Sequence, residues 1–458
     1  MENIYFESIS LHGIHQRYDL NISFNKNLTI LHGQNGTGKS TLIHILANVA
    51  NCDFIRFAFL DFLSITVTYS DKSVLKIIST KDREISIVAD NQETYTFSKR
   101  EVIETIHLYE RDEHMYNRNF FKSHLIDNIN SFIEENNIRK IGTSYFPAFR
   151  TMLEAWSSQS ENKNGSVDKR NTMRSATKFS RNLFGPFLPE INFPSPLEIE
   201  NNLRSEIKEA QIRIARYESS IFSDSFVKVF SALLSGKSET FIDSERILSE
   251  ISDLTTSQTN SKLGDIEDNS QTYKQLQALV MSSSKSGDVE SSTSGALAVY
   301  RDALKERQNY RARAFEEIDK YFRVVNSFLD RKVLSYELDK EKRIPRVGLE
   351  FPDGSWSRIQ VMSSGERQLL TMLYAVNKMS GNSAVLIDEP ELSLHIDWQE
   401  DLLNKMMDQL GGRQIIVCTH SPSIAEDFDE YMIEVCPKFN DLADDFDTIT
   451  FDCDEDYL

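Results

Sequence analysis

The stretch Gly33-Gln34-Asn35-Gly36-Thr37-Gly38-Lys39-Ser40-Thr41 decides how the rest of this chain is interpreted. It fits the pattern G-x-x-x-x-G-K-S/T and lies between a β-type run, Leu28–Leu31, and a helix-forming run, Leu42–Ala47. This order of strand, glycine-rich loop and helix distinguishes a phosphate-binding loop from a turn that contains Lys-Ser by chance. We therefore predict a phosphate-binding loop here.

The residue types of this loop also predict how it holds a nucleotide. Small residues allow consecutive backbone N–H groups to curl round a β-phosphate, and the helix that follows directs its positive end toward the same anion. Lys39 is long enough to reach β- and γ-phosphate oxygens, and Ser40 is placed to hold a magnesium ion. The predicted nucleotide-binding residues of the loop are Gly33, Asn35, Gly36, Thr37, Gly38, Lys39, Ser40 and Thr41.

Composition limits the class of protein. The chain has 458 residues, of which 40% are apolar and 26% charged, as in a globular protein with two or three domains or one domain with a large insertion. No apolar run approaches the roughly 20 residues of a membrane span, and the N-terminus Met1–Glu7 lacks a basic start followed by an apolar core. We expect a cytoplasmic protein without a membrane partner.

Cysteine content and charge exclude further classes. Four scattered cysteines predict neither a disulfide framework nor a zinc site. The formal net charge of −19 argues against general nucleic-acid binding, because non-specific affinity comes mainly from Lys and Arg neutralising phosphates. A local basic groove remains compatible with this charge.

Residues 1–150 are predicted to form the N-terminal lobe of an α/β head. Alternating runs at Ser64–Tyr69, Val74–Ile78 and Glu84–Val88 favour an antiparallel sheet with one wet face. A helix is predicted over Phe121–Asn137, followed by a core strand that Pro147 ends. Arg150 should therefore lie at a strand end, where ligands of open α/β sheets collect.

Residues 151–196 are interpreted as a basic linker, and residues 197–330 as an insertion in the head. The linker holds Lys169, Arg170, Arg174, Lys178 and Arg181, which we interpret as a solvated loop, with a phosphate, nucleic-acid or acidic-protein contact as the alternative. Helical patterns over Leu197–Ser235 and Leu297–Leu329 flank polar segments, Thr255–Gln271 and Ser282–Ser294. They predict an antiparallel helical hairpin with a flexible polar tip.

Residues 331–435 are predicted to form the C-terminal lobe of the head, and residues 436–458 an acidic tail. Arg346–Phe351 and Trp356–Val361 flank a turn that suits a hairpin. The last 18 residues carry eight acids and no base, which predicts a solvated interaction strip.

A second polar constellation follows the apolar run Ala384–Ile387. Such a run predicts a buried strand, and it ends in two adjacent carboxylates, Asp388 and Glu389. The end of a strand beside a phosphate loop is where a magnesium ligand is needed, so Asp388 is predicted to bind Mg²⁺. Glu389 can then polarise the attacking water as general base. Alone, the run would indicate only a core strand and a turn.

Two further motifs accompany these carboxylates. Met362–Gln368, M-S-S-G-E-R-Q, precedes a helix, and the backbone N–H groups of Ser364 and Gly365 make a second anion-binding helix end, although a plain helix cap has the same backbone. Ile415–Cys418 predicts another buried strand, and His420 follows it closely enough to reach a γ-phosphate. Two anion-binding helix ends in one chain are explained if nucleotide lies between two subunits.

Together the phosphate loop, M-S-S-G-E-R-Q, V-L-I-D-E-P-E-L-S-L-H and V-C-T-H-S-P resemble the ABC-type ATPases related to the OLD and SMC families. The resemblance covers roughly residues 1–150 and 330–435. It implies a P-loop head, with a mixed sheet and an antiparallel β subdomain, from which the helical-hairpin arm projects. It also implies ATP and Mg²⁺ as cofactors.

The resemblance assigns roles residue by residue. Lys39, Glu389 and His420 would be catalytic, with His420 as the switch histidine, and Ser40 and Asp388 would be metal ligands. The signature Ser363, Ser364, Gly365 and Glu366 would contribute to the nucleotide of the opposite subunit, and Ser393, Leu394 and His395 would form the D-loop. The implied unit is at least a dimer, with a hexamer as the larger alternative.

Two departures from the family pattern refine the expected function. No glutamine for a Q-loop lies near Tyr145–Arg150, and only 38 residues follow His420, too few for the C-terminal Toprim nuclease of OLD proteins. We therefore expect an ATPase that lacks its own nuclease, resembling the ATPase subunits of bacterial anti-phage defence systems. The PARIS type is the nearest resemblance and the Septu type the alternative, with a separately encoded Toprim or HNH nuclease as effector partner.

Other ligands and functions stay open at this point. The expected trigger is DNA or an acidic phage protein that mimics DNA. The rival function is an SMC-like ATPase that clamps DNA in repair or chromosome maintenance. A transporter ATPase is disfavoured because the helical insertion is longer than a transporter needs.

Overall fold

The computed structural model describes residues 4–80, 84–111, 124–150, 152–153, 169–235, 244–259, 291–339, 344–378, 383–410 and 412–439. The chain divides into two compact units. We call Met1–Ser195 with Ser363–Leu458 the head, and Pro196–Met362 the arm unit. Among the described helices, none combines the length and the apolar character needed to cross a membrane.

The first sheet of the head is antiparallel throughout. Its strands, in spatial order, are β15 (Lys438–Phe439), β2 (Tyr18–Ser23), β1 (Phe6–Ile14), β4 (Ser64–Tyr69), β5 (Val74–Ser79), β6 (Glu84–Val88) and β7 (Thr94–Ser98). In β4, Ile65, Val67 and Tyr69 are buried and alternate with half-buried residues, because successive side chains of a strand point to opposite faces. The predicted antiparallel subdomain is confirmed.

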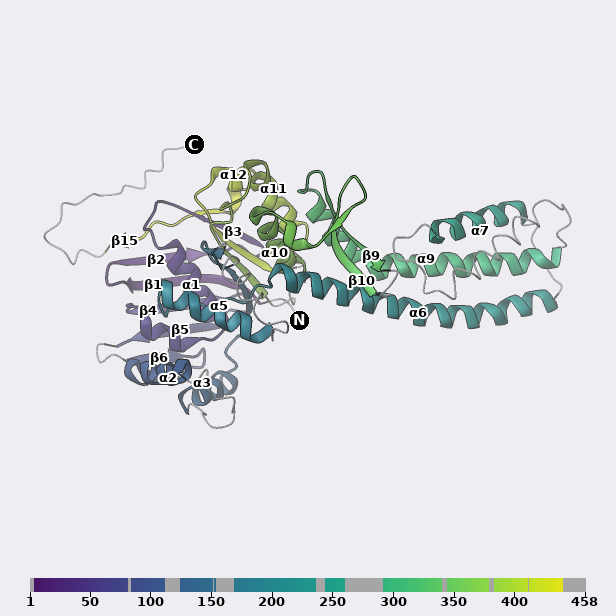
Figure 1. Ribbon diagram of the computed structural model, residues 1–458. Helices are drawn as coiled ribbons and strands as arrows, with labels where there is room; N and C mark the ends of the chain where they lie inside the picture. Colours follow the sequence, from purple (N-terminus) through teal and green to yellow (C-terminus); the bar gives the residue numbers. More distant parts are fainter. Residues whose placement is uncertain are drawn as a thin grey trace. The chain divides into compact units, whose positions relative to one another are not determined.

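The second sheet of the head is parallel and carries the sequence motifs. Its order is β14 (Met432–Glu434), β3 (Leu28–His32), β13 (Gln414–Cys418), β12 (Ser383–Asp388) and β8 (Gly142–Phe146). All neighbouring pairs are parallel, so every strand ends at the same edge. Parallel and antiparallel strands thus form two separate sheets of the predicted α/β head (Figure 1).

Helix α1 (Lys39–Ala50) follows the phosphate loop directly. Nine of its twelve residues are buried, and it contacts β8, β12 and β13. A helix that is apolar nearly all round must be enclosed by other elements. Its side chains belong to one core with residues of both sheets, which fixes the position of the loop at its start.

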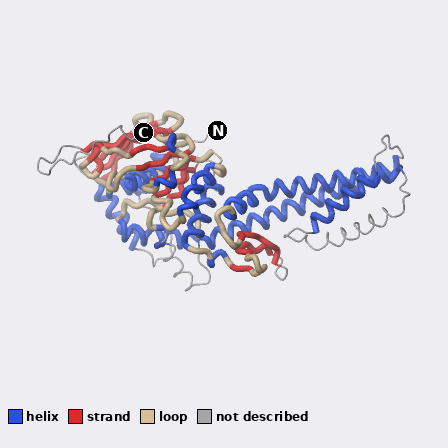
Figure 2. Tube along the Cα trace, turned by 90° about the horizontal axis from the view of Figure 1, so that it is seen from above, coloured by secondary structure: helices blue, strands red, loops and turns tan. Residues whose placement is uncertain are grey.

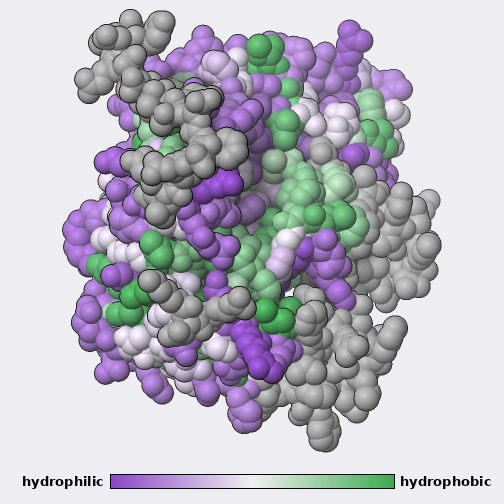
Figure 3. All heavy atoms as spheres, turned by 90° about the vertical axis from the view of Figure 1, so that its left-hand side faces the viewer, coloured by the Kyte–Doolittle hydropathy of each residue, from purple (hydrophilic) through white to green (hydrophobic). Residues whose placement is uncertain are grey.

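The remaining elements of the head surround these sheets. They are η1 (Phe54–Phe59), α2 (Lys99–Arg111), α3 (His124–Glu135), α5 (Lys169–Phe184), α10 (Ser364–Lys378), α11 (Ile396–Met407), α12 (Pro422–Ala425) and η3 (Asp429–Tyr431). Helix α3 confirms part of the predicted helix, whose residues 121–123 lie outside the described ranges. On the face of the head in Figure 3, hydrophilic side chains predominate and apolar ones gather round a central hollow.

The basic stretch forms helix α5, so its interpretation as a loop was wrong. Thr177 and Ser180 are buried on the inner face, and the Thr177 hydroxyl accepts a hydrogen bond from the Ile191 backbone at 3.1 Å. Arg181 is also engaged: it donates to the Leu188 carbonyl at 2.8 Å and pairs with Asp53 at 3.4 Å. The side chains of 169–175, which include Lys169, Arg170 and Arg174, lie outside the description.

The arm unit consists of α6 (Pro196–Ser235), α7 (Ser244–Thr259), α9 (Ser291–Asn326), β9 (Val333–Asp339), β10 (Ile344–Glu350), β11 (Trp356–Ser357) and η2 (Ile359–Val361). Helices α6 and α9 run side by side, as Figure 2 also shows. The two predicted helices are confirmed. Helix α7 was missed, and it extends into Thr255–Gln271, which was predicted to be polar and irregular. Residues 260–290 lie outside the described residues.

The strands after the second arm belong to the arm unit, although residues 331–435 were predicted to form the C-terminal lobe. Strand β9 was missed, and it pairs with β10 along its whole length. Asn326 bonds both the N–H and the carbonyl of Leu334, and the Tyr336 hydroxyl donates to Asp319 at 2.8 Å. These contacts with α9 explain why the hairpin packs with the arms.

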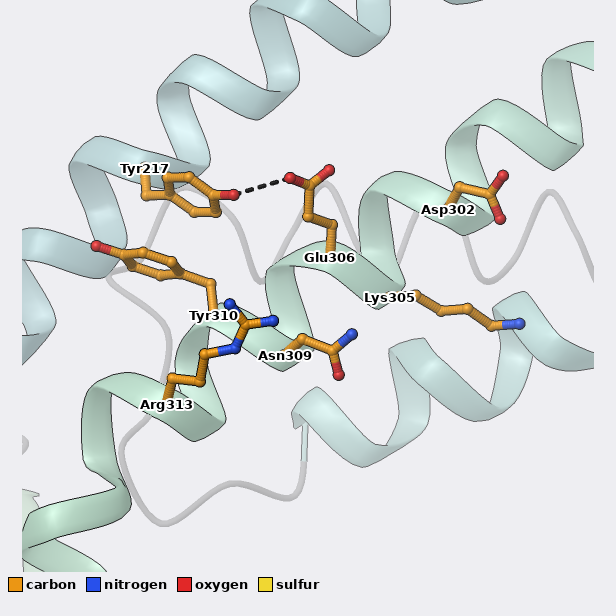
Figure 4. A pocket seen from close by; sticks show the side chains of 7 residues that line it. All are labelled: Tyr217, Asp302, Lys305, Glu306, Asn309, Tyr310 and Arg313. Atoms are coloured by element: carbon orange, nitrogen blue, oxygen red, sulfur yellow. Dashed lines mark hydrogen bonds between the residues drawn. The ribbon is translucent and has the colours of Figure 1, made fainter.

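Polar and aromatic contacts fix the register of the two arms. Arg307 of α9 and Glu218 of α6 form a buried ion pair, and the rings of Tyr217 and Tyr310 stack with centroids 3.8 Å apart. Beside this stack lies a cavity of about 330 Å³, where the Tyr217 hydroxyl donates to Glu306 at 2.8 Å (Figure 4). Because each contact requires a particular pair of residues to meet, sliding one helix along the other would break them together.

Candidate active site

The phosphate loop needs glycine at three positions. Gly33, Gly36 and Gly38 have φ angles of 142°, 85° and 90°, which residues other than glycine rarely adopt. At Gly38 a Cβ atom would also lie only 2.2 Å from the hydroxyl oxygen of Tyr18. Tyr18 bonds the side chain of Thr41, so this tyrosine of β2 supports the loop from the antiparallel sheet.

Lys39 is held by the loop itself. Its ammonium donates to the carbonyl oxygens of Gly33 at 2.8 Å and Gln34 at 2.9 Å, and only 5% of the residue is exposed. Burial lowers the pKa of Lys39, while the neighbouring thiol and carboxyl groups oppose that shift. The charge is thus positioned at the start of α1 before any phosphate arrives.

Ser40 and Asp388 have the geometry expected of a metal site. Asp388 ends β12, is 4% exposed, and hydrogen bonds with the side chain of Ser40. Its oxygen Oδ1 is buried and has no partner among the geometrically defined hydrogen bonds of the described residues. Burial raises the pKa of Asp388. A buried carboxylate oxygen beside a serine hydroxyl fits Mg²⁺, which prefers oxygen ligands.

Arg150 supports the turn that follows Asp388. Its guanidinium donates to the carbonyl oxygens of Asp388, Glu389 and Pro390 at 3.0, 2.9 and 3.0 Å. Arg150 lies near the end of β8, as predicted, but it is only 2% exposed. Arg150 therefore holds the backbone of the site from inside the protein. The sequence had instead suggested that it contacts a ligand.

Glu389, Glu391 and His420 form a cluster at the same edge. Glu389 has a φ of 52°, and its carboxyl oxygen Oε1 lies 3.4 Å from Nε2 of His420. Burial, followed by the hydrogen bond and the negative charge of Glu391, raises the pKa of Glu389 to about 8. Burial lowers the pKa of His420. Both shifts favour the uncharged form of the side chain.

The signature begins helix α10 with a capping box. The Ser363 N–H donates to Glu366 Oε2 at 2.7 Å, and the Glu366 N–H donates to Ser363 Oγ at 3.3 Å. Glu366 is 8% exposed, so its carboxylate caps the helix. The N–H groups of Ser364 and Gly365 are the ones this cap leaves for an anion.

The D-loop packs directly on the signature. A Cβ atom at Gly365 would lie 2.4 Å from the carbonyl oxygen of Ser393, whose φ is 69°. Leu394 is buried and its N–H bonds the Glu391 carbonyl at 3.0 Å, whereas His395 is exposed. Gly365 is therefore required by contact within one subunit, in addition to any role toward phosphate.

The parallel sheet explains which predicted residues meet. Strand β13 lies between β3 and β12, so its carboxyl end brings His420 between the phosphate loop and the two carboxylates. Sequence reasoning missed Tyr18, Arg150 as a backbone brace, and Glu391. For Glu391 a signal existed, since it is a third acid within four residues.

A comparison with protein families identifies this arrangement. Residues 8–425 match the family model described as AAA ATPase domain. The chain belongs to the AAA ATPase domain family. It is an ATPase, and the phosphate loop, Asp388, Glu389 and His420 all lie within the matched residues.

Curated relatives of this ATPase carry related descriptions. The Retron Ec83 probable ATPase of Escherichia coli is 24% identical over 250 residues, which cover 53% of this chain and 44% of the relative. The Retron Vc95 probable ATPase of Vibrio cholerae serotype O1 biovar El Tor is 26% identical over 135 residues, 26% of each chain. This chain thus spans less than half the length of the curated relatives it matches.

Solved structures with a similar chain path include Smc head domains. One, with an extended coiled coil and bound to the C-terminal domain of ScpA, derives from Pyrococcus furiosus; it is 14% identical with a TM-score of 0.40 and covers 95% of this chain and 96% of its own. Another, with a coiled coil and joint, derives from Pyrococcus yayanosii; it is 13% identical with a TM-score of 0.35, at 96% and 97% coverage.

The raised pKa of Glu389 predicts a pH-dependent stability of the nucleotide-free ATPase. A carboxyl group whose pKa rises from 4.5 to about 8 on folding stabilises the fold at low pH, and this contribution is lost as pH rises through 8. With EDTA present, the melting temperature of wild type minus that of Glu389→Gln should therefore fall between pH 5 and pH 8.5. A difference independent of pH would contradict the shifted pKa.

Proposed function

We propose that this ATPase hydrolyses ATP at a site completed by a second copy of the chain, and that this cycle controls a separately encoded effector nuclease in bacterial anti-phage defence. The observation that carries the first half is the meeting of Lys39, Asp388, Glu389 and His420 at one edge of the parallel sheet. No other group of described residues combines a phosphate loop with carboxyls and a histidine at one sheet edge.

Each side chain has a task that its position supports. Lys39 and the loop N–H groups bind the β- and γ-phosphates, and Ser40 with Asp388 would hold Mg²⁺, which supplies charge neutralisation at those oxygens. His420 contacts the γ-phosphate. Glu389 accepts the proton of the attacking water once it has released its own proton, because only the carboxylate can act as base.

Completion by a second copy rests on the signature. Two backbone N–H groups at the start of α10 remain for an anion, and the two apolar residues that flank the D-loop, Leu392 and Ile396, are 42% and 53% exposed. Exposed apolar groups next to a polar site are typical of an interface. The assembly is at least a dimer, and a hexamer built from the same contacts is the larger alternative.

The role in defence rests on the motifs and on the relatives. The motif order resembles the ATPase subunits of PARIS and Septu systems, whereas the curated relatives are described as probable ATPases of retrons. PARIS, Septu and retron systems all contain an ATPase. The type of nuclease encoded beside the gene, Toprim or HNH, would distinguish PARIS from Septu. The trigger would be DNA or an acidic phage protein that mimics DNA.

A second candidate is an SMC-like ATPase that clamps DNA in repair or chromosome maintenance. The inserted helix pair α6 and α9, of 40 and 36 residues, favours it. Charge argues for the first candidate, because a net charge of −19 repels DNA over most of the surface. Within the basic stretch, the Arg181 side chain is engaged inside the head by Leu188 and Asp53.

Lys39→Ala and Glu389→Gln should separate binding from hydrolysis. Removal of Lys39 deletes a charge-assisted contact to phosphate and should weaken ATP binding at least ~10-fold, whereas Glu389→Gln keeps the shape and should lower hydrolysis at least ~100-fold with ATP affinity preserved. Nucleotide binding and phosphate release measure both. Equal loss of ATP affinity in the two variants would contradict the role of Glu389.

The defence role is tested in bacteria that carry this gene with its neighbouring gene. Phage plaque numbers should fall with the wild-type pair, and the fall should disappear with Lys39→Ala or without the neighbour. Ile103→Ala, an exposed position on α2, is the matched control and should protect like wild type. Protection by Lys39→Ala equal to wild type would overturn ATP control. If the wild-type pair gives no protection against phage, and loss of the gene instead makes the bacteria sensitive to DNA damage, the second candidate is favoured.

A further inference from the structure

We propose that Glu391 is a positioning residue for hydrolysis, which holds the loop Thr419–Ser421, here named the switch loop, against the turn that carries Glu389. This inference rests on the roles proposed above for Glu389 and His420. Glu391 itself need not touch nucleotide, because it would act through His420.

The contacts of one oxygen atom carry the inference. Oε1 of Glu391 accepts hydrogen bonds from the hydroxyl of Thr419 at 2.8 Å, from the backbone N–H of His420 at 2.8 Å and from the backbone N–H of Ser421 at 3.1 Å. Three consecutive residues of the switch loop thus converge on one atom. A carboxylate oxygen bonded to several N–H and O–H groups makes strong, charge-assisted contacts.

Only one of the two carboxylate oxygens of Glu391 binds the switch loop. Oε2 of Glu391 is buried and receives none of the hydrogen bonds from the switch loop, which all go to Oε1. The side chain of Glu389 is a hydrogen-bonding neighbour of Glu391. Glu391 therefore lies between the candidate base and the switch loop, with one oxygen committed to the loop.

Both sides of this contact are anchored to the rest of the head. Arg150 fixes the backbone before Glu391, and the Glu391 carbonyl accepts from the Leu394 N–H of the D-loop at 3.0 Å. On the other side the Ser421 hydroxyl donates to Gln399 of α11 at 2.7 Å, and Gln399 donates to the Leu394 carbonyl at 3.0 Å. The carboxylate closes a ring of contacts through the turn, the D-loop, α11 and the switch loop.

This ring determines where His420 can lie. The backbone N–H of His420 is bound to Glu391 while its ring nitrogen Nε2 lies 3.4 Å from Glu389 Oε1. Without Glu391, the backbone N–H of His420 loses its acceptor and that of Ser421 keeps only the Thr419 hydroxyl, so the switch loop can shift. A displacement of about 1 Å at a catalytic centre can slow a reaction about 100-fold. The phosphate loop, which binds ATP, makes none of these contacts through Glu391.

Three substitutions of Glu391 separate the effect of its side-chain length from that of its negative charge. Glu391→Ala should lower kcat about 100-fold with ATP affinity and KM within about 3-fold of wild type. Glu391→Gln keeps the acceptor at the same reach and should retain kcat within about 10-fold of wild type. Glu391→Asp keeps the charge but is one methylene shorter, so it should be slower than Glu391→Gln. Glu400→Ala, an exposed glutamate of α11, is the control expected to match wild type.

The double variant Glu391→Ala/His420→Ala tests whether Glu391 acts through His420. If it does, the double variant should be no more than about 2-fold slower than His420→Ala alone, since coupled residues are not additive. Multiplied losses, or Glu391→Asp as fast as Glu391→Gln, would overturn the positioning role. If Glu391→Ala does not fold, the kcat of Glu391→Gln compared with that of Glu391→Asp tests the positioning role.

Failure of the inference can be told from failure of the proposed function. Wild-type kcat in Glu391→Ala, with His420→Ala and Glu389→Gln both inactive, would overturn only the role of Glu391. Wild-type kcat in His420→Ala and Glu389→Gln would overturn the proposed site itself.

Discussion

The guanidinium of Arg150 donates hydrogen bonds to three successive carbonyl oxygens, those of Asp388, Glu389 and Pro390. A fourth donation, to the carbonyl oxygen of Leu392 at 3.4 Å, extends the same contact to the residue before the D-loop. Burying this cation is costly unless it is well bonded, so the turn after β12 is held in one backbone conformation. That conformation includes the left-handed Glu389, whose strain is stored at the candidate catalytic centre.

The strand order then converts this local geometry into a site. Because β13 separates β3 from β12, the switch loop lies between a phosphate loop and a pair of carboxyls, and each comes from a different part of the sequence. Glu391 and Arg150 hold adjacent parts of the same edge by contacts more than 25 residues apart in sequence. The head therefore carries a preorganised centre, while the capping box leaves two N–H groups of the signature for the second copy that we propose.

The extent to which sequence predicted this structure follows from the range of each interaction. The phosphate loop, the strands β4 and β6 and the helices α6 and α9 depend on local periodicity and turn chemistry, and their positions were predicted closely. Helix α5 was interpreted as a loop because its charges are conspicuous, although Thr177 and Ser180 are buried on its other face. Strand β9, and the membership of β10 in the arm unit, depend on packing against α9, which no local sequence pattern reveals.

The candidate site shows the same division. Lys39, Asp388 and Glu389 are recognisable because their motifs are contiguous, whereas the contact of Arg150 with the Asp388 turn spans 238 residues. Ser363 and Glu366 were predicted to reach nucleotide, and the structure shows them bonded to each other in a capping box, which leaves Ser364 and Gly365 for that task.

The central claim is that two copies share each nucleotide site, and mixing two inactive variants tests it most directly. Lys39→Ala disables the phosphate loop, and Ser364→Glu places a negative charge at the exposed start of α10 without the collision with Ser393 that a side chain at Gly365 would cause. In a mixed dimer one site collects both defects and the other none. We predict that a verified mixture of the two variants recovers ATP hydrolysis toward about a quarter of the wild-type rate, as random pairing of two alleles gives half mixed dimers with one intact site each. Hydrolysis that stays at the level of the separate variants, in a mixture shown to contain mixed oligomers, would contradict the shared site.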